Sequence, residues 1–542
     1  MNSKFCTYDP VNKIWSGRKR QQIYNVDANA GYLFLQKLIQ TPKNIFQISD
    51  DTGVELTCAD VYERSLKFAN FFTQINLKQG DVVGLIASNS ENLVPIIFGC
   101  LVIGVAVNPL SIVMGVEDIE HMWSKTKPKV IFSDGKIIET VKSAVDKMEL
   151  DAKIYTMIDK VEGFGYVEDI LNRDFDVESY EFPDLPNTPS TIALISCSSG
   201  TTSSPKGICL SHKQIIEHSF LYFNQNLKQT DLIFNSCLTY WTIHMVLTTF
   251  SVLYNIPNVI TAETLTPELW MDIVDRHKVT VVFSSIAFAA SIIRSKKLRK
   301  MESIRIFSTG GSVFSEKLMQ DLQEIIPNGK VIFGYGMTEI GRVSTASGDE
   351  RSIGLTSGYL HYNVQAKICD ETGTALEPNK IGEIYCKTQT HFSSYFGDPE
   401  KYKECFDSSG FLRTGDAGYF DESGRIYIID RIKHMIKSIN SYKVTPIEIE
   451  SIINEIDGVI QSCVVGVFDE EVFYDKIYAF VIKDQARDDL TEEFIVNFVN
   501  AKVIEEKKIT GGVHFVDKFP MTPSGKVLNR ELKKIAAMLI KC

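Results

Sequence analysis

The chain has 542 residues, 44% of them hydrophobic and 23% charged, and its formal net charge at pH 7 is -11. Because this length exceeds what one compact core usually supports, we expect two or more domains. No lysine- or arginine-rich run exceeds a few residues. Nucleic-acid binding requires a clustered basic surface, so we expect no nucleic-acid partner.

The eleven cysteines stand singly, without a Cys-x-x-Cys pair, which is typical of structural thiols in a reducing compartment. The first residues, MNSKFCTYDP, lack the apolar core of a signal peptide. The longest apolar run, residues 93–107, is shorter than the ~20 residues that span a bilayer, and it predicts a buried helix leading into a strand. We expect an intracellular, cytoplasmic protein with no transmembrane segment and no obligate protein partner. The alternative is peroxisomal, although the terminal Ile540-Lys541-Cys542 is not a convincing targeting signal.

Short β-branched runs alternate with helix-like stretches through most of the chain. They fall at residues 81–87, 129–133, 153–158, 191–196, 279–284, 303–308 and 330–333. This alternation predicts βαβ units and mainly parallel sheets. Residues 359–429 instead show short strands separated by turn signals, which predicts a small β-barrel. A new α+β pattern begins after Asp430-Arg431-Ile432-Lys433, so we place a domain boundary there.

The strongest chemical signal is the segment Ser198-Ser199-Gly200-Thr201-Thr202-Ser203-Ser204-Pro205-Lys206-Gly207. Small hydroxyl residues and glycine let backbone N–H groups converge, and Lys206 adds a cation, so this loop can wrap a polyphosphate. It is not a Walker-type loop, because no Gly-Lys-Ser/Thr closes it and a strand follows where a helix should begin. Taken alone, a flexible surface loop explains the composition equally well.

Four further segments are each weak alone. Tyr335-Gly336-Met337-Thr338-Glu339 follows a predicted strand and offers an aromatic ring, a hydroxyl and an oxygen ligand for magnesium. Thr414-Gly415-Asp416 places a carboxylate in a predicted turn. The charged stretch at residues 430–433 and the exposed turn Thr522-Pro523-Ser524-Gly525-Lys526 complete the set. Singly, each is read as an ordinary turn or a solvated charge.

Together, in this order and spacing, the five segments resemble the adenylate-forming superfamily: acyl-coenzyme A synthetases, 4-coumarate–coenzyme A ligases, beetle luciferases and nonribosomal peptide adenylation domains. The resemblance covers almost the whole chain. It implies an α/β fold with a large N-terminal domain of two mainly parallel α/β sheets plus a small β-barrel, followed by a small mobile α+β C-terminal domain. The AMP-binding domain would span residues 1–430, the C-terminal domain residues 434–542, and the hinge residues 431–433.

The resemblance also implies ATP, Mg²⁺ and coenzyme A as reactants, with a small-molecule carboxylic acid as substrate. Lys526, Thr338 and Lys206 would be catalytic, and Glu339 would hold the metal. Thr309-Gly310-Gly311-Ser312-Val313 matches the stretch beside adenine, with Ser312 and Val313 departing from the family. The residues expected to bind nucleotide or coenzyme are Ser198, Ser199, Gly200, Thr201, Thr202, Lys206, Gly310, Gly311, Ser312, Gly334, Tyr335, Gly336, Thr338, Asp416, Arg431, Lys437 and Lys526.

Three departures from the family pattern bear on specificity. Ser203 replaces the usual glycine of the phosphate loop. Trp241 stands where the family has an acyl-pocket histidine, and His244 lies three residues further on. Trp241 and Arg342 are therefore candidate substrate-pocket residues, with a core tryptophan and a solvent-facing arginine as the alternative interpretation. The stretch after the hinge that carries Lys-Gly-Tyr in the family reads Lys437-Ser438-Ile439-Asn440-Ser441-Tyr442 here, with one extra residue and no glycine, so we expect thioester formation to be the slower half-reaction.

The leading hypothesis is an acid–thiol ligase that adenylates a fatty or aromatic acid and transfers the acyl group to coenzyme A. A luciferase-like oxygenase acting on an adenylated luciferin-type acid is the second. A non-catalytic nucleotide- or acyl-binding descendant is the third. The joint presence of six candidate site residues argues against it: Lys206, Thr338, Glu339, Asp416, Arg431 and Lys526.

Overall fold

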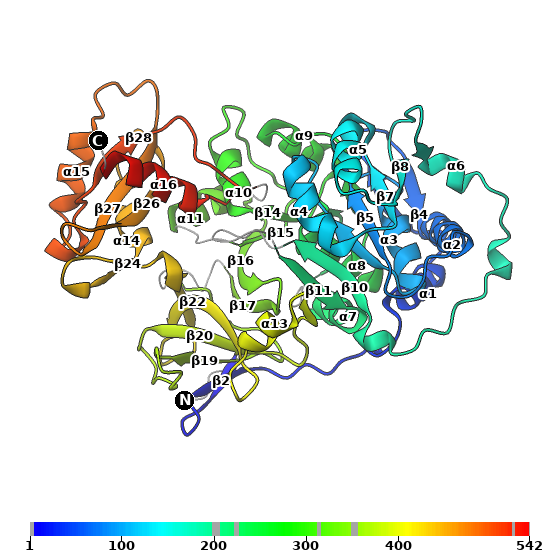
Figure 1. Ribbon diagram of the computed structural model, residues 1–542, viewed down its shortest axis with the longest axis horizontal. Coiled ribbons are helices and arrows are strands. Elements are labelled where there is room, and N and C mark those ends of the chain that lie inside the picture. The colour runs from blue at the N-terminus through cyan, green and yellow to red at the C-terminus, as the bar shows by residue number, and fades with distance from the viewer. Residues whose placement is uncertain are drawn as a thin grey trace.

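The computed structural model describes residues 5–197, 206–221, 227–311, 316–347, 356–522 and 526–540. Two mainly parallel sheets flanked by helices form the larger part of the molecule, an antiparallel sheet lies below them, and the C-terminal domain stands to one side (Figure 1). The predicted fold class is confirmed. Within the described ranges, no helix combines the length and the apolar character needed to cross a membrane.

The first sheet has eight strands in the order β21-β11-β10-β6-β5-β7-β8-β9, and the pairs from β10 to β9 are parallel. Its strands are β5 (Val82–Ile86), β6 (Ala106–Pro109), β7 (Val130–Ser133), β8 (Lys153–Thr156), β9 (Gly165–Tyr166), β10 (Ile192–Cys197), β11 (Gly207–Ser211) and β21 (Ser394–Tyr395). The apolar run at 93–107 forms the wholly buried helix α3 (Leu93–Val102) and then β6, as the sequence predicts. A helix that is apolar on every side must be covered on every side, which places α3 in the core.

The second sheet has nine strands in the order β18-β17-β16-β15-β14-β12-β13-β3-β4, and the pairs from β16 to β3 are parallel. Its strands are β3 (Ile45–Ser49), β4 (Glu55–Thr57), β12 (Ile233–Phe234), β13 (Asn258–Ile260), β14 (Val281–Ser285), β15 (Ile306–Gly310), β16 (Lys330–Met337), β17 (Gly341–Ser347) and β18 (Tyr359–Leu360). The main helices of this part are α1 (Ala30–Gln40), α2 (Cys58–Gln74), α4 (Val116–Thr126), α5 (Ile138–Lys147), α6 (Val167–Leu171), α7 (His212–Leu221), α8 (Thr242–Tyr254), α9 (Pro267–His277), α10 (Ile286–Ile293), α11 (Glu316–Ile325) and α13 (Pro399–Glu404).

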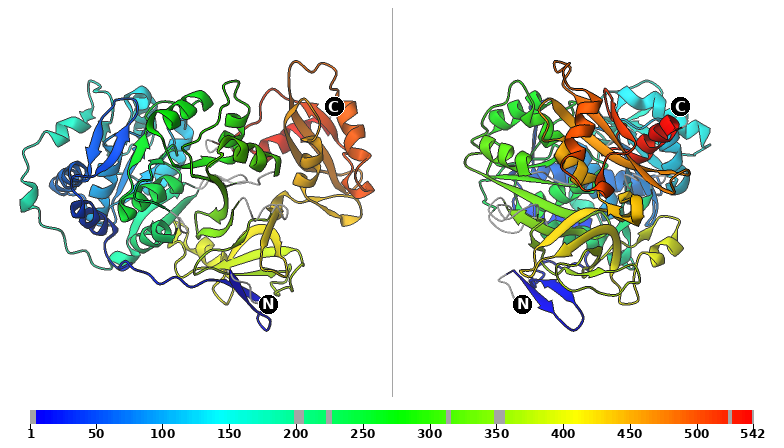
Figure 2. Two further views of the ribbon diagram at one scale, coloured as in Figure 1. Left: turned by 180° about the vertical axis from the view of Figure 1, so that it is seen from behind. Right: turned by 90° about the vertical axis from the view of Figure 1, so that its left-hand side faces the viewer.

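The antiparallel sheet occupies the region predicted as a small barrel. It contains β19 (Gln365–Cys369), β20 (Gly382–Lys387), β22 (Leu412–Phe420) and β23 (Ile426–Arg431), and the N-terminal hairpin β1 (Cys6–Asp9) and β2 (Ile14–Gly17) pairs with β19. Trp15 on the hairpin stacks on Phe420, with ring centroids 5.4 Å apart. From this hairpin the chain crosses to α1 at the far end of the molecule (Figure 2).

The C-terminal domain has its own apolar core, which includes Ile449, Ile453, Val464 and Ile477. Its strands are β24 (Ile436–Lys437), β25 (Lys443–Val444), β26 (Val459–Asp469), β27 (Tyr474–Lys483) and β28 (Gly512–Phe515), and its helices are α14 (Pro446–Ile453), α15 (Glu492–Asn500) and α16 (Asn529–Ile540). Arg294 of the large domain donates to the Ile460 carbonyl oxygen at 2.6 Å, and Lys443 forms an ion pair with Glu371.

Candidate functional site

The carboxyl ends of β14, β15 and β16 form one edge of the nine-stranded sheet. Gly310 pairs with Gly334 there, and a Cβ atom on Gly310 would lie 2.4 Å from the Gly334 carbonyl oxygen. Gly311 follows with φ +90°, a conformation that side chains rarely adopt. The predicted glycines are therefore required by close backbone packing at the edge where ligands bind in α/β sheets.

Tyr335, Asp416 and Arg431 come together beside this edge. The Tyr335 hydroxyl donates to Asp416 Oδ2 at 2.6 Å, and Arg431 Nε lies 2.8 Å from Asp416 Oδ1. Two local predictions were wrong. Tyr335 lies within β16, which continues to Met337 because it pairs with β17, and Asp416 lies within β22 rather than in a turn. The strand pair β22–β23 places Asp416 directly opposite Arg431.

Burial dominates the electrostatics of this triad. Asp416 is 6% exposed, and burial raises the pKa of its carboxyl, while Arg431 and the Tyr335 hydroxyl oppose that rise. Burial also raises the pKa of Tyr335 well above its usual range, so the hydroxyl keeps its proton and donates. Each carboxylate oxygen has lone pairs beyond the one engaged here, so Asp416 can still accept hydrogen bonds from a ribose.

Glu339 lies just after β16 and faces the first sheet. Its Oε1 accepts from the Tyr395 hydroxyl at 3.1 Å, and burial raises the pKa of Glu339. Tyr395 is on β21, which pairs with β11 directly after Lys206, and the Lys206 ammonium lies 5.2 Å from the Tyr395 ring centroid. The two sheets thus converge at Glu339, with the lysine of the phosphate loop nearby.

Lys526 reaches this cluster from the C-terminal domain. Two hydrogen bonds tie its backbone to Thr522: Thr522 N donates to the Lys526 carbonyl at 2.7 Å, and Lys526 N donates to Thr522 Oγ1 at 3.1 Å. Burial lowers the pKa of Lys526, Arg431 lowers it further, and the Asp416 and Glu339 carboxylates oppose both effects. The side chain therefore lies in the field of the predicted nucleotide site.

Two residues that the motifs did not single out, Tyr395 and Lys401, belong to the same cluster, which also includes Lys433 of the charged stretch at residues 430–433. Tyr395 holds Glu339, as described. Burial lowers the pKa of Lys206, and the neighbouring Lys401 lowers it further. Burial also lowers the pKa of Lys433, with a smaller contribution from Arg431, to about 8. Lys401 lies on α13 and comes close to Lys206 only because α13 follows β21, so no local sequence motif identifies it as a site residue.

The candidate substrate-pocket residues lie on one face of the nine-stranded sheet. Trp241 immediately precedes α8, and its half-buried indole packs on the apolar cluster that includes Ile306 and Ile332. Arg342 on β17 donates through Nη2 to Ser308 Oγ at 3.3 Å. His244 is buried within α8, and burial lowers its pKa to about 4.

The remaining predicted residues fall in three groups. Thr338 lies in the turn after β16, and Gly336 pairs with Arg342. The exposed Lys437 lies on β24, where its backbone N–H donates to Asp475 Oδ2 at 2.9 Å. Ser198, Ser199, Gly200, Thr201, Thr202, Ser203, Ser312 and Val313 lie outside the described residues.

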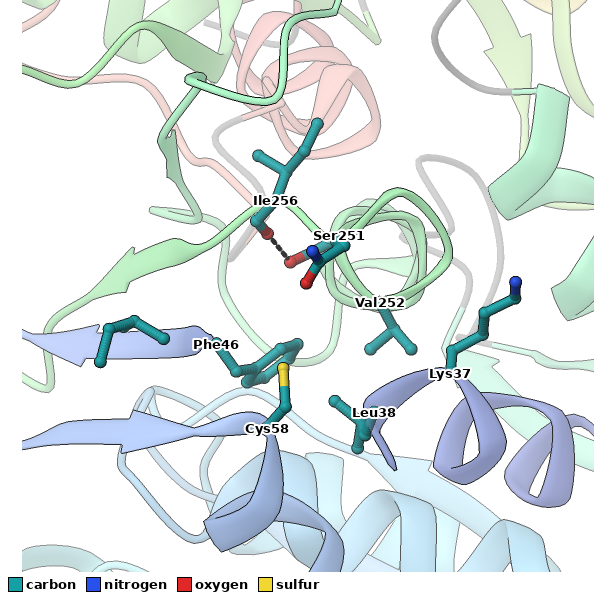
Figure 3. A pocket seen from close by; sticks show the side chains of 9 residues that line it. Lys37, Leu38, Phe46, Cys58, Ser251, Val252 and Ile256 are labelled. Atoms are coloured by element: carbon teal, nitrogen blue, oxygen red, sulfur yellow. Dashed lines mark hydrogen bonds between the residues drawn. The ribbon is translucent and has the colours of Figure 1, made fainter. Parts of the chain in front are cut away.

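A small pocket between α1, β3 and α8 is separate from this site (Figure 3). Leu38, Phe46, Ser251 and Ile256 line it, and Ser251 donates to the Ile256 carbonyl oxygen there. Ser251 is near the C-terminal end of α8, whereas Trp241 is at its start, so the two regions are roughly 15 Å apart along the helix.

The chain matches known proteins along both of its domains. The model described as "AMP-binding enzyme" matches residues 35–396, and the model "AMP-binding enzyme C-terminal domain" matches residues 448–526. Acyl-CoA synthetase 7 of Caenorhabditis elegans is 27% identical over 531 residues, which cover 95% of this chain and 97% of that protein. A luciferin 4-monooxygenase of Nipponoluciola cruciata is 28% identical over 505 residues, covering 89% and 90% of the two chains. The crystal structure of ATP-bound MatB from Rhodopseudomonas palustris superposes with a TM-score of 0.82 at 23% identity, covering 94% of this chain and 99% of that one.

Proposed function

We propose, since the chain belongs to the AMP-binding enzyme family of the adenylate-forming superfamily, that it is an acid–thiol ligase. It converts a carboxylic acid and ATP into an acyl-adenylate and pyrophosphate, and then transfers the acyl group to coenzyme A. Family membership supports the use of ATP and a ligase of the acyl-CoA synthetase type.

The observation that carries the proposal is the position of Lys526. The C-terminal domain brings this ammonium into the field of Asp416 and Glu339, which belong to the large domain. A protein that only bound nucleotide would need no cation delivered from a second domain.

Adenylation requires cations because it joins two anions. A carboxylate oxygen attacks the α-phosphorus of ATP, the bond to the bridging oxygen breaks, and negative charge moves onto the departing pyrophosphate. Lys206, Lys526 and Arg431 surround the site where this charge develops. A fixed cation or donor aimed at developing charge contributes ~3 kcal/mol, or about 100-fold in rate. Asp416 and Tyr335 orient the nucleoside against the sheet edge.

The donor set fits magnesium bound chiefly through the nucleotide. Glu339 Oε1 accepts from Tyr395, which leaves Oε2 to face a cation, and Mg²⁺ usually combines one or two carboxylates with phosphate oxygens. Across the described ranges, no three His, Cys, Asp or Glu side chains cluster as a metal site, so Glu339 would act with ATP. The ion would supply charge neutralisation of the phosphates.

A panel of carboxylic acids tests the proposal through pyrophosphate release, measured with and without coenzyme A. We expect ATP-dependent release with a subset of acids, and a thioester product only when coenzyme A is present. Release without any thioester would leave an adenylating enzyme with another acceptor, and no release with any acid would contradict the proposal.

A further inference from the structure

Lys401 is a cation of the large domain that belongs to none of the sequence motifs and lies beside the phosphate loop. It occupies the first turn of α13, the short helix that follows β21. β21 pairs with β11, the strand that begins directly after Lys206, so α13 follows close to that strand (Figure 1). The Phe396 amide donates to the Gly207 carbonyl oxygen at 2.8 Å, and this bond holds the segment leading into α13 against the end of the phosphate loop.

Cys405 links Lys401 to the rest of the cluster. Its Sγ lies 3.2 Å from the Lys401 carbonyl oxygen and 3.8 Å from the Tyr395 hydroxyl oxygen. The same hydroxyl donates to Glu339 Oε1 at 3.1 Å, and the Lys206 ammonium lies 5.2 Å from the centroid of the tyrosine ring. A chain of short contacts therefore joins the backbone of Lys401 to both Glu339 and Lys206.

Two lysines approach one another at this point, where like charges repel. Burial lowers the pKa of Lys206, and the nearby ammonium of Lys401 lowers it further. Asp398 is the carboxylate that opposes this effect, and its Oδ1 already accepts from the Lys401 backbone amide at 3.1 Å. Over the ranges of the chain that the structure describes, the exposed Lys401 side chain forms no ion pair with a carboxylate. An anion bound by both ammonium groups would remove their repulsion.

The end of the triphosphate that leaves as pyrophosphate is the anion that suits this pair. The adjacent phosphate loop is predicted to wrap a polyphosphate, and pyrophosphate carries more negative charge than the single phosphate group of an adenylate. A lysine ammonium is a compact charge with three donors on a flexible stem, so it can turn toward several phosphate oxygens. Lys526 reaches the site from the C-terminal domain, in the field of Asp416, whereas Lys401 stands beside Lys206 on the side of the first sheet. The two added cations therefore suit different parts of the triphosphate.

We propose that Lys401 is a further phosphate-binding residue, which holds the β- and γ-phosphates of ATP together with Lys206 and remains on them as pyrophosphate departs. The inference rests on the proposed function and adds a residue to the same site. When the carboxylate oxygen attacks the α-phosphorus, the bond from that phosphorus to the bridging oxygen breaks, and its electron pair goes to pyrophosphate. The Lys401 ammonium stabilises that added charge and gives up no proton.

Ligands that differ in their phosphates provide the test. The Kd values for ATP, pyrophosphate and AMP are measured by titration calorimetry with Mg²⁺ on the full-length parent, Lys401→Met, Lys401→Arg and Lys403→Met. Lys403 is the matched control, because it lies on the same helix and pairs with Glu400 at 2.9 Å. Lys401→Met should raise the Kd for ATP and for pyrophosphate about 10-fold, as expected for one lost charged hydrogen bond, and should leave the Kd for AMP within about twofold. Lys401→Arg, which keeps the charge, and Lys403→Met should both stay close to the parent.

Equal losses for AMP and ATP would make Lys401 a structural residue and overturn the inference, as would a Lys401→Met variant that binds pyrophosphate like the parent. Acetylation of lysines in the parent decides without any variant: pyrophosphate should protect Lys401 and leave Lys403 reactive, and equal labelling of Lys401 with and without pyrophosphate would contradict the inference. A parent that binds ATP but activates no carboxylic acid would contradict the ligase proposal and leave the phosphate-binding role of Lys401 in place. A parent that binds neither ATP nor pyrophosphate would remove both.

Discussion

Replacing Lys526 by methionine separates the two half-reactions that the proposed function joins. The side chain reaches the field of Asp416 and Glu339, whereas its backbone is held by hydrogen bonds with Thr522 that do not involve the ammonium. Methionine is unbranched and only one atom shorter than lysine, and it leaves these backbone hydrogen bonds in place, so we expect the domain to fold normally. Only the charge is lost from the adenylation site.

The expected loss of adenylation rate follows from the role of the Lys526 charge. A cation preorganised for departing pyrophosphate contributes ~3 kcal/mol, so adenylation should slow by at least about 100-fold. Burial lowers the pKa of Lys526 in the absence of nucleotide, and the phosphates of ATP would favour its charged form. The loss should therefore appear mainly in kcat, with a smaller change in the KM for ATP.

The assay measures each half-reaction separately. ATP–pyrophosphate exchange reports adenylation, and thioester formation from a supplied acyl-adenylate reports transfer to coenzyme A. Lys534→Met is the matched control, because Lys534 lies on α16 of the same domain and pairs only with nearby Glu531 among the ion pairs of the described residues. We expect Lys526→Met to lose exchange and keep transfer within about threefold. Equal loss of both activities would refute the reasoning and make Lys526 a structural residue.

Three further predictions concern the same site and the linker. Asp416→Asn should raise the Kd for ATP by roughly 10- to 100-fold, because charged hydrogen bonds are lost, with little change in melting temperature; an unchanged Kd in titration calorimetry would contradict the nucleotide role. At pH 8.5, ATP binding should take up protons, since burial lowers the pKa of Lys433 to about 8 and phosphates would favour its charged form. Calorimetry in two buffers of different ionisation enthalpy measures this uptake, and Lys433→Met should reduce it; equal uptake in both proteins would assign it elsewhere. Asn440 has φ 58°, so Asn440→Ala should destabilise the C-terminal domain by ~1 kcal/mol relative to Asn440→Gly in urea unfolding, and equal midpoints would count against this strain.

The parallel core was predictable because its strands carry continuous apolar runs. For β5, β7 and β15, at least one end of the strand lies within two residues of the corresponding end of a predicted β-branched run. The antiparallel pairings were harder to predict from the sequence. The N-terminal hairpin pairs with β19, several hundred residues away, and no local pattern encodes such a contact. Pairing between distant segments is determined by the whole fold.

Some residues of the site were also predictable from local motifs, whereas others were not. Tyr335 and Asp416 were found from their motifs, but glycine in each motif suggested a turn, whereas both residues lie in strands. Gly415 has φ +70°, and the pairing of β22 with β23 shifts register just beyond it, so this glycine fits an irregular strand. Tyr395 and Lys401 belong to no motif. They join the site only because β21 adds to the edge of the first sheet.

The proposed two-step reaction would require the C-terminal domain to rotate after adenylation, and the contacts around the linker restrict where that rotation would occur. Arg431 is fixed to the large domain, because it pairs with Asp416 at 2.8 Å and donates to the Thr414 carbonyl at 3.2 Å. Five residues later, Ile436 is buried in the core of the C-terminal domain, and a Cβ atom on Gly466 would lie 2.6 Å from its Cγ2. Rotation about either residue would break these contacts. We therefore expect the pivot between them, in the short helical turn Ile432–His434 and Met435, where, among the ion pairs of the described residues, rotation would break only the local contact of His434 Nδ1 with Asp430 Oδ1 at 3.5 Å. Such a pivot would lie after Arg431 and would leave the Asp416–Arg431 pair in place for both half-reactions.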